Sequence, residues 1–475
     1  MKSLSGALLF TGREAFLSQE ALKVWQTLSD EQVKAFQREK RLLVLSAKGV
    51  PWLFLNGGSP ARFTPRELRQ LVGYCREGAQ LLGLSLVRLH LSDPVELGWN
   101  PREEAAFFTA LLEGYPGRGS RKEDVPVSFD ILPACGERAR CFAEGVNLCR
   151  TLVDRPSSEI SPQSFQEEIA ALFSSGPFSL RAWVGKELES EGFGGIAAVG
   201  RGAPVPPRLL DLRYSPVGPV GRVLLVGKGI TFDGGGMNLK SAQEMMNMRV
   251  DMAGAAAVVG IMKIVSALNL PLEISALMPL AENLLSPTAY RQGDVLTLYG
   301  GKRVEIRNTD AEGRLLLADA LAYGSLFKPD LTIDLATLTG AAVSALGERV
   351  AALFSRSDSL AKELVSWGER VAEPLWRLPL CDIYRGDLKS DVADLKNSQY
   401  GTGAGAIKAA LFLDSFAPKG EWAHLDIAGT AYVEKGSFFG IPGATGFGVR
   451  LLSLFLEEWS KRPSNSRKNL RKSKA

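Results

Sequence analysis

The chain has 475 residues, 45% hydrophobic and 23% charged, a balance that is typical of soluble globular proteins and leaves enough chain for two or three domains. The formal net charge is +4, but residues 461–475 contain seven Lys or Arg and no acid. Without these seven, 49 basic residues stand against 52 acidic ones. The basic excess therefore belongs to the C-terminal tail, and the rest of the chain is slightly acidic.

Histidine is scarce, since the chain contains only His90 and His424. A zinc site of three histidines is excluded. The His-Glu-x-x-His motif is also excluded, because its two histidines must lie four residues apart on one helix. His90 lies in the apolar run Leu86–Leu91 and is expected to be a structural histidine. Any metal must therefore be held mainly by carboxylates.

The cysteines and the apolar stretches indicate the compartment. The five cysteines are odd in number and include no Cys-x-x-Cys pair, which favours a reducing compartment and argues against a disulfide framework or a thiolate zinc site. The apolar patch Ala7–Phe10 is too short for the core of a signal peptide. No stretch approaches about 18 uninterrupted apolar residues. We expect a cytoplasmic protein with no membrane span.

Residues 1–135 are predicted to form a smaller N-terminal α/β domain. Short apolar runs at Leu42–Ser46 and Trp52–Leu55 occur together with helical patterns at Pro65–Leu82 and Glu103–Leu112. This mixture of strands and helices is typical of α/β domains. The region contains no recognisable catalytic motif.

Residues 136–163 are predicted to connect this region to a second domain. Gly136–Val153 has the pattern of one long helix, and the polar, proline-containing stretch Asp154–Gln163 follows it. After the second domain, residues 461–475 form a polar, basic segment that is expected to be a disordered tail.

Residues 164–460 are predicted to form a larger catalytic α/β domain with a mostly parallel sheet. Apolar strand runs occur at Val223–Val226, Ile274–Met278 and Leu331–Leu335, and helical patterns at Gly254–Leu268 and Leu315–Leu326 lie between them. Strands separated by single helices are typical of parallel sheets.

A glycine-rich segment at 226–240 follows the first of these strands, and in it Asp233 precedes three glycines. Ligand sites form at the carboxyl ends of strands in open α/β sheets, and glycines let the backbone approach a ligand closely. A dinucleotide-binding pattern fails because Phe232 stands at its third glycine, and a Walker A loop fails because no glycine precedes Lys240. A tight turn with solvated lysines remains an alternative.

Two further acidic clusters precede helical patterns. Asp251 stands before a helix of small residues, where an N-cap role is the alternative to a functional one. In the segment 308–314, Thr309 and Glu312 fit a capping box, which leaves Asp310 and Arg314 unexplained. Two acids at a helix entrance beside an arginine also suit a metal site with an anion-binding cation.

Together the clusters offer four carboxylates near strand-to-helix junctions: Asp233, Asp251, Asp310 and Glu312. Carboxylates that converge in one cleft repel one another unless divalent cations neutralise them. Pairs of cations about 3.5–4 Å apart are a known hydrolytic device that activates water. Lys240 would then stabilise the oxyanion of a tetrahedral intermediate.

The run Asn-Thr-Asp-Ala-Glu-Gly-Arg-Leu at 308–315 matches the signature of the leucyl aminopeptidase (cytosol aminopeptidase) family of two-metal exopeptidases. The chain resembles the catalytic domain of that family over residues 140–457, with similar segments at 226–240, 250–258, 289–295, 336–341 and 422–431. Residues 1–135 fit the variable N-terminal domain of the family by length and pattern only.

The resemblance implies two divalent metal ions, Mn²⁺ or Zn²⁺, in each subunit. The ligands of the tighter site would be Lys228, Asp233, Asp251 and Glu312, and those of the more exchangeable site would be Asp233, Asp310 and Glu312. A lysine coordinates only as a neutral amine, so Lys228 would need a strongly lowered pKa, for which two nearby cations supply a reason.

The remaining roles also come from the resemblance. Lys240 would polarise the scissile carbonyl, and Arg314 would hold a bicarbonate ion that acts as general base. Met248, Thr337 and Leu338 would line the pocket for the N-terminal side chain. A metal-bridged hydroxide would attack the peptide carbonyl and give a gem-diolate.

The implied substrates are peptides with a free N-terminus. Leucine-like residues would be preferred, but with broad specificity because methionine adapts to several shapes. The resemblance further implies a homohexamer.

The chain departs from the family pattern at two positions. Gly234 stands where family members often have serine, and Lys408 places a charge where small uncharged residues are common. No metal ligand is lost by either change.

Two other functions compete with this interpretation. DNA binding through the basic tail is not favoured over a solubilising role of that tail. A two-metal phosphoesterase is opposed by the signature at 308–315.

Overall fold

The computed structural model describes the strands at 5–10, 42–47, 50–55, 86–90 and 128–132 and the ranges 137–434 and 442–462, with side chains from Arg138 onward. The predicted helices at 65–82 and 103–112, the side chain of His90 and the tail from residue 463 lie outside these described residues. The chain forms two compact units, Met1–Asn147 with Val433–Gly443 and Leu148–Tyr432 with Ala444–Ala475.

The first unit contains a five-stranded sheet. The apolar runs predicted as strands at 42–46 and 52–55 form two of its members, β2 and β3. They pair antiparallel, and the other neighbours in the sheet pair parallel. The order of strands is β2 (Leu42–Ala47), β3 (Val50–Leu55), β1 (Ser5–Phe10), β4 (Leu86–His90) and β5 (Ser128–Leu132).

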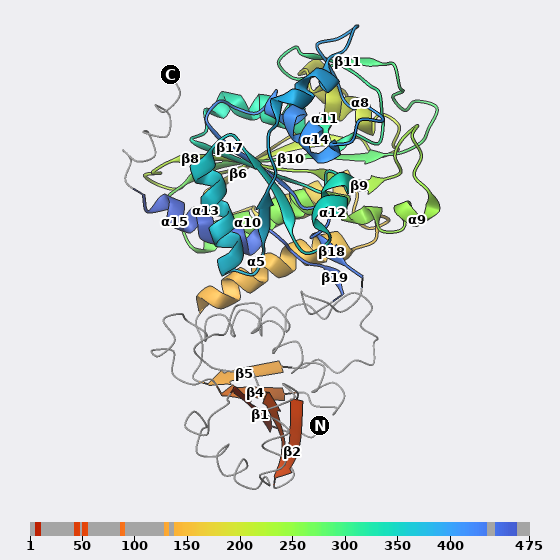
Figure 1. Cartoon of the computed structure of the whole chain (residues 1–475). Helices are drawn as coiled ribbons and strands as arrows, with labels where there is room; N and C mark the ends of the chain where they lie inside the picture. The colour runs from red at the N-terminus through yellow and green to blue at the C-terminus, as the bar shows by residue number, and fades with distance from the viewer. Residues whose placement is uncertain are drawn as a thin grey trace. The chain divides into compact units, whose positions relative to one another are not determined.

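The second unit is built on a nine-stranded mixed sheet whose centre is parallel (Figure 1). The sheet begins with β15 (Leu375–Arg377), β14 (Ala351–Ser355), β17 (Glu421–Asp426) and β13 (Leu331–Ala336), and continues with β8 (Arg222–Gly227), β10 (Glu273–Asn283), β7 (Arg208–Tyr214) and β6 (Phe178–Val184). Strand β9 (Gly229–Asp233) also pairs with β10. Strands β17, β13, β8, β10 and β9 run parallel, while β14 pairs antiparallel with β17, and β7 pairs antiparallel with β10 and β6. The prediction of an α/β fold with a mostly parallel sheet is confirmed.

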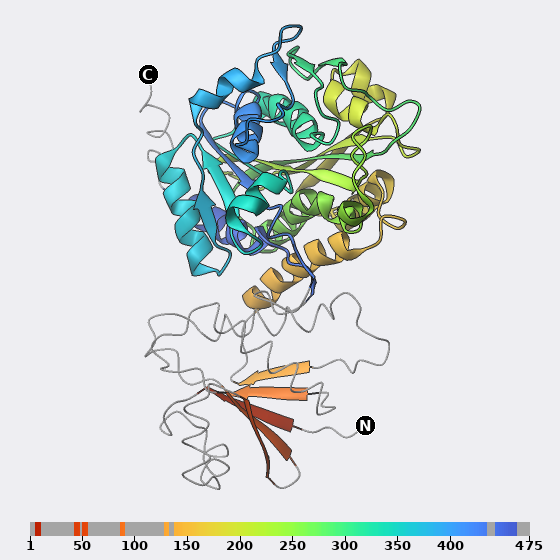
Figure 2. The same cartoon turned by 45° about the vertical axis from the view of Figure 1, so that its right-hand side comes forward.

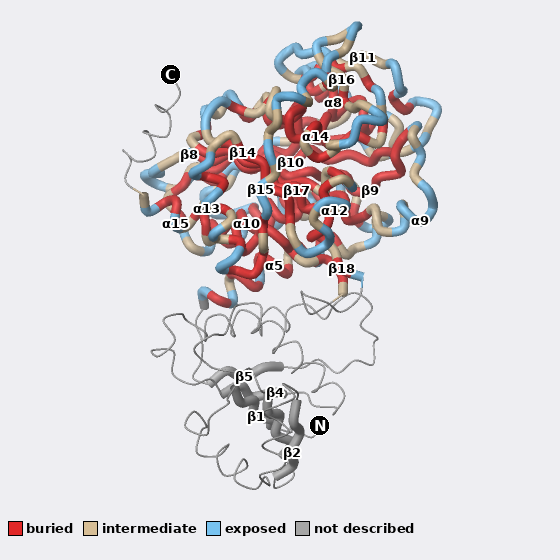
Figure 3. Tube along the Cα trace, in the orientation of Figure 1, coloured by how far each residue is buried: buried red, intermediate tan, exposed pale blue. Residues whose placement is uncertain are grey.

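Helices cover both faces of this sheet, as the two views in Figures 1 and 2 show. One face carries α8 (Gly194–Gly200), α11 (Gly313–Gly324) and α14 (Gly405–Asp414); the other carries α10 (Ala253–Ala267), α13 (Asp358–Arg370) and α15 (Val449–Ser460). The central strands β8, β10 and β13 are buried along almost their whole length because both of their faces are covered. Figure 3 accordingly shows the buried residues concentrated in the sheet and on the inner sides of the helices.

The remaining elements are short or peripheral. The predicted long helix at 136–153 is α5 (Glu137–Asp154). The others are α6 (Pro162–Leu172), α7 (Lys186–Ser190), α9 (Ala242–Met245), α12 (Gly340–Leu346), the 3-10 helices η4 (Met248–Met252), η5 (Ser325–Phe327) and η6 (Asp382–Leu388), and the strands β11 (Val295–Thr297), β12 (Arg303–Glu305), β16 (Leu395–Lys396), β18 (Tyr432–Val433) and β19 (Gly443–Ala444).

Helix α10 packs unusually close to the sheet. A Cβ atom on Gly254 would lie 2.2 Å from the carbonyl oxygen of Leu335 and 2.8 Å from the backbone nitrogen of Lys228, so only glycine fits there. The stretch Met248–Ala267 is long and apolar enough to cross a membrane, yet 83% of its apolar window is buried within the protein. This burial is what a core helix shows, and the small residues of α10 are explained by close packing.

The strand that leads into the glycine-rich segment is interrupted at one residue. Strand β8 ends at Gly227 and β9 begins at Gly229, and both pair with β10. Between them, the backbone N–H of Lys228 donates to Leu335 at 3.0 Å and its carbonyl oxygen accepts from Ala255 at 2.8 Å. Lys228 is therefore fixed by β13 on one side and by the start of α10 on the other.

Candidate metal centre

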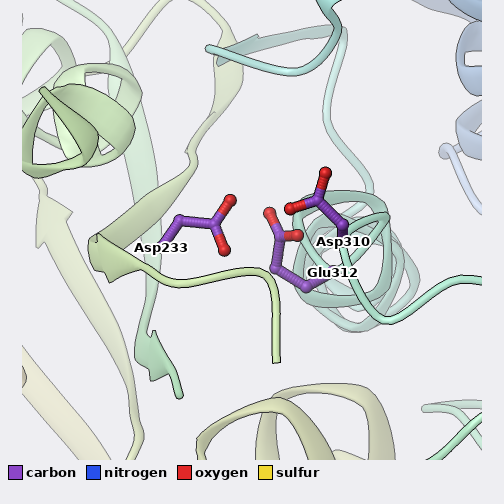
Figure 4. Close-up of side chains that lie close together, drawn as sticks. All are labelled: Asp233, Asp310 and Glu312. Atoms are coloured by element: carbon purple, nitrogen blue, oxygen red, sulfur yellow. The ribbon is translucent and has the colours of Figure 1, made fainter. Parts of the chain in front are cut away.

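Three of the predicted carboxylates meet at the carboxyl ends of the parallel strands. Asp233 ends β9, and Asp310 and Glu312 belong to the loop before α11. Their nearest oxygen atoms all lie within 4.8 Å of one another. Figure 4 shows the three side chains pointing toward a common point.

Lys228 joins the fourth carboxylate, Asp251, to this group. Its Nζ atom lies 2.7 Å from Oδ1 of Asp251 and 2.9 Å from Oε1 of Glu312, and it donates to the carbonyl oxygen of Thr337 at 3.0 Å. The hydroxyl of Thr337 donates to the same Oδ1 of Asp251 at 2.8 Å. Because Lys228, Asp251 and Glu312 are all buried, they form an interior cluster of charges.

Lys240 contacts the same group from its more exposed side. Its Nζ atom lies 2.7 Å from Oδ2 of Asp233 and also forms an ion pair with Asp310. The Lys240 side chain is 13% exposed, compared with 3% for Lys228. The ammonium group of Lys240 is therefore the cation of this cluster that a ligand can reach first.

The four carboxylates and two ammonium groups perturb one another strongly. Burial raises the pKa of Asp251 to about 8, with Lys228 lowering it and Asp233 raising it further. Burial also raises the pKa values of Glu312 and Asp310, and Asp233 adds to both increases. The charged form of each of these carboxylates is disfavoured because the site is poorly solvated and holds more negative than positive side chains.

The protein groups alone shift Lys228 in the direction opposite to that of a metal-bound amine. Burial lowers its pKa, but the charges of Asp251, Glu312 and Asp233 outweigh burial and raise it. The lowered pKa expected for a coordinating lysine therefore has to come from bound cations, which would replace the proton between the amine and these carboxylates.

The donor set fits divalent cations. Among the described residues, Oδ2 of Asp251 is a buried carboxylate oxygen with no hydrogen-bond partner. Such an oxygen is costly to bury unless a cation or a proton satisfies it. Carboxylate oxygens are the ligands that hard divalent cations prefer, and a neutral amine is acceptable to Zn²⁺ and Mn²⁺.

The structure rejects the helix-capping explanations for two of the acidic clusters. Helix α11 begins after Glu312 without a side-chain cap, and the hydroxyl of Thr309 instead donates to Gly235 at 2.7 Å. Helix α10 begins after Met252, so Asp251 does not cap it either. The alternative of a turn with solvated lysines is also rejected, because Lys228 and Lys240 are paired with carboxylates.

Arg314 lies on α11 in the same region and is buried. Its Nη1 atom donates to the backbone oxygen of Asn397 at 2.7 Å, while its Nε atom has no hydrogen-bond partner within the described part of the chain. Burial lowers its pKa to about 10, against the raising effect of Glu312 and Asp426. A buried guanidinium with an unused donor is suited to bind a small anion.

The predicted pocket residues lie beside the metal ligands in the chain. Met248 begins η4, which carries Asp251, and Thr337 and Leu338 directly follow β13. All three are partly exposed. Lys408, the unusual charge in this sequence, is buried and donates to the hydroxyl of Thr402 at 2.6 Å, with Asp387 at 3.7 Å. Its charge is thus paired within the protein.

Sequence reasoning missed several residues that hold the cluster in place. Asn397 accepts the backbone N–H of Arg307 at 2.8 Å and donates to the carbonyl oxygen of Asn308 at 2.7 Å, so it ties down the start of the signature segment. Asp426 and Asn283 end the strands β17 and β10. A polar residue at the carboxyl end of a buried strand was the signal that could have found the last two.

Comparisons with known proteins agree with this geometry. Residues 147–453 match the family described as "Cytosol aminopeptidase family, catalytic domain". The "Probable cytosol aminopeptidase" of Syntrophotalea carbinolica is 47% identical over 332 residues, which is 70% of this chain and 67% of that protein. The protein of the same name from Chlorobaculum tepidum is 42% identical over 368 residues, 74% and 73% of the two chains.

A solved structure is similar over almost the whole chain. The structure of "Bottromycin maturation enzyme BotP in complex with Mn" has a TM-score of 0.84 and 34% sequence identity, covering 97% of this chain and 100% of its own. The family match and the identities to the relatives lead to one conclusion. The chain belongs to the cytosol aminopeptidase family and is a metal-dependent aminopeptidase.

Proposed function

We propose that this aminopeptidase releases N-terminal residues, preferably leucine-like ones, from peptides at a centre that holds two divalent cations. The observation that carries the proposal is the convergence of Lys228 with the four carboxylates, one of which keeps a buried oxygen that has no hydrogen-bond partner in the described part of the protein. Such an arrangement is unfavourable in a protein that binds no cation there.

The proposed ligands divide into two overlapping sets. Lys228, Asp233, Asp251 and Glu312 would hold one cation, and Asp233, Asp310 and Glu312 the other. Mn²⁺ or Zn²⁺ suits these donors, and the similar BotP structure is a complex with Mn. When bound, the cations supply an activated water and Lewis-acid polarisation of the peptide carbonyl.

The side chains of the protein supply the remaining steps. Lys240 places an ammonium group at the accessible side of the centre, where it stabilises the oxyanion that forms when the carbonyl is attacked. Arg314 would hold a bicarbonate ion through its Nε donor, which has no partner among the described residues, and that ion would supply a general base. The requirement for a free substrate amine beside the centre gives exopeptidase action.

Specificity, assembly and location complete the proposal. Met248, Thr337 and Leu338 line an apolar pocket for the first side chain, in which the methionine adapts to several shapes. We further propose a homohexamer, as implied by the sequence resemblance, and a cytoplasmic location, which the names of the relatives support.

Hydrolysis of leucine p-nitroanilide tests the proposal. Activity should require Mn²⁺ or Zn²⁺, disappear on chelation and return when metal is added. N-acetyl-leucine p-nitroanilide, which lacks the free amine, should not be cleaved. Asp310→Ala and Glu312→Ala should each lower kcat/KM by more than about 100-fold. Loss of a residue that only hydrogen-bonds to a metal ligand typically costs about 10–100-fold, and loss of the ligand itself should cost more.

Asp382→Ala is the matched control, since it removes an exposed carboxylate that pairs with Arg385 outside the centre. It should leave activity unchanged. Full activity in either ligand variant, or activity that survives complete metal removal, would contradict the proposed function.

A further inference from the structure

Asn283 reaches both carboxylates that would be shared by the two cations. It is the last residue of β10, is fully buried, and lies opposite Asp233 in the register of β9 and β10. Its Nδ2 atom lies 2.9 Å from Oδ1 of Asp233, 3.4 Å from Oε2 of Glu312 and 3.1 Å from the carbonyl oxygen of Thr309. One amide group therefore contacts the end of β9 and the signature segment together.

The contacts of Asn283 and of the two lysines divide the carboxylate oxygens between them. Asn283 donates to Oδ1 of Asp233, whereas Lys240 contacts Oδ2 at 2.7 Å. It also donates to Oε2 of Glu312, whereas Lys228 contacts Oε1 at 2.9 Å. Each carboxylate is thus held from two sides, with one oxygen bound by Asn283 and the other by a lysine.

The surroundings fix the direction of the amide. If the group were turned over, its oxygen would face three acceptor oxygens and repel them. In the observed direction, Oδ1 of Asn283 has no hydrogen-bond partner among the described residues. A Cβ atom on Gly236 would lie 2.8 Å from that oxygen, and Gly236 has a φ of +61°. Gly236, the last of the three glycines that follow Asp233, therefore leaves the room that the amide needs.

We propose that Asn283 is a positioning residue for the two-cation centre. Resting on the proposed function, this role is to hold Asp233 and Glu312 so that one oxygen of each faces the cations. The side chain itself contacts neither cation nor substrate. Residues that hydrogen-bond to metal ligands commonly raise metal affinity or activity about 10–100-fold, because they hold the ligands in the right orientation.

The test replaces the amide with an apolar side chain of similar size, Asn283→Leu, in the full-length protein. Mn²⁺ binding to the metal-free protein is measured by titration calorimetry. The variant should bind Mn²⁺ about 10–100-fold more weakly at one or both sites. Electron paramagnetic resonance of the Mn²⁺-loaded protein should also show a weakened or altered spin-coupled signal, because the shared carboxylates are no longer held.

Ser275→Ala is the matched control on the same strand. It removes an equally buried hydrogen bond, which Ser275 donates to Asp211 at 2.8 Å. Neither residue is a proposed metal ligand. A purely structural role for Asn283 would make the two variants alike, with lowered stability and unchanged Mn²⁺ binding. Asn283→Val, which is smaller and suits a strand, provides the same measurement if the leucine variant does not fold.

The outcomes separate the two proposals. Wild-type Mn²⁺ affinity and an unchanged spin-coupled signal in the folded Asn283 variants would overturn the positioning role and leave the aminopeptidase intact. If the wild-type protein itself binds no divalent cation and cleaves no leucine p-nitroanilide, the proposed function fails instead. Weaker Mn²⁺ binding by the Asn283 variants, but not by Ser275→Ala, supports the positioning role.

Discussion

The carboxylate of Asp426 accepts the hydroxyl proton of Thr339 at 2.6 Å, and its other oxygen accepts the backbone N–H of Leu338 at 3.1 Å. Through these bonds, the end of β17 fixes the loop that follows β13. The same loop presents the carbonyl oxygen of Thr337 to Lys228. Asp426 therefore supports a proposed metal ligand without touching it.

Replacing Asp426 by alanine should weaken both the fold and the centre. The Thr339 hydroxyl and the Leu338 N–H would lose their acceptor, and a buried donor left unpaired costs about 1–3 kcal/mol. Urea unfolding of the metal-free protein should show the lower free energy of unfolding. Assays with leucine p-nitroanilide should show a lower kcat/KM. Asp426→Asn, which keeps one acceptor oxygen, should lose less. Unchanged stability of the alanine variant would show that this anchoring is unimportant.

Removing Lys240 should separate catalysis from metal binding. In Lys240→Ala, kcat should fall about 10²–10³-fold, the usual effect of deleting one oxyanion-stabilising donor. Metal affinity should stay the same or increase, because the ammonium group competes with cations for Asp233 and Asp310. Steady-state kinetics and calorimetry measure the two effects. A variant that binds metal weakly would mean that Lys240 helps to build the centre instead.

A methyl group at position 254 should disturb both the sheet and Lys228. In Gly254→Ala, the new Cβ atom meets backbone atoms of Leu335 and Lys228, and overpacking of this kind costs about 1–3 kcal/mol. Gly340→Ala is the control, since nothing lies within 4 Å of its Cβ position in helix α12. Alanine there should be neutral or slightly stabilising. Equal unfolding free energies for the two variants would contradict the close packing.

The buried pair of His424 and Asp334 should make stability depend on pH. The Nδ1 atom of His424 lies 2.5 Å from Oδ1 of Asp334, and Trp422 donates to Oδ2 of Asp334 at 2.8 Å. Burial lowers the pKa of His424, but the charge and hydrogen bond of Asp334 outweigh burial and raise it above its ordinary value of 6.5. The folded state therefore binds the proton more tightly than the unfolded chain does.

It follows that the stabilisation by His424 is complete below about pH 6.5 and is lost as the pH rises through the folded pKa. The difference in unfolding free energy between the wild type and His424→Asn, measured without metal, should be larger at acidic than at alkaline pH. Ser355→Ala removes a neutral buried bond to the Trp422 carbonyl oxygen and should lower stability equally at every pH. A His424 difference that does not vary with pH would refute the charged pair.

Much of the catalytic unit could be predicted because its signals are local. Apolar runs rich in Val, Leu and Ile predicted the strands β8, β10 and β13, and the run of small residues after Asp251 predicted the helix α10. The sequence also predicted that the acidic clusters would share a site, since the carboxyl ends of parallel strands lie at one edge of a sheet. In the structure, ligand atoms of Asp233, Asp310 and Glu312 lie within 4.8 Å of one another, as this interpretation expects, and the assignment of these residues as metal ligands stays a prediction.

The supporting contacts could not be predicted because they join segments far apart in the chain. Asn397 holds the segment at 307–308 from a position about 90 residues later, and nothing near it in the sequence indicates that pairing. The alternative explanation of Thr309 as part of a capping box fails for a related reason. A distant loop at Gly235 offered the hydroxyl a better partner than the local helix did.

The break between β8 and β9 limits how this sequence can change in length. Successive side chains of a strand point to opposite faces, so one inserted or deleted residue between Val223 and Lys228 would turn the amine away from Asp251 and Glu312. An insertion at the exposed connection around Val217, before β8, leaves that alternation intact. Single-residue insertions are therefore expected to abolish activity between Val223 and Lys228 and to be tolerated around Val217, a contrast that a library of such insertions would map directly.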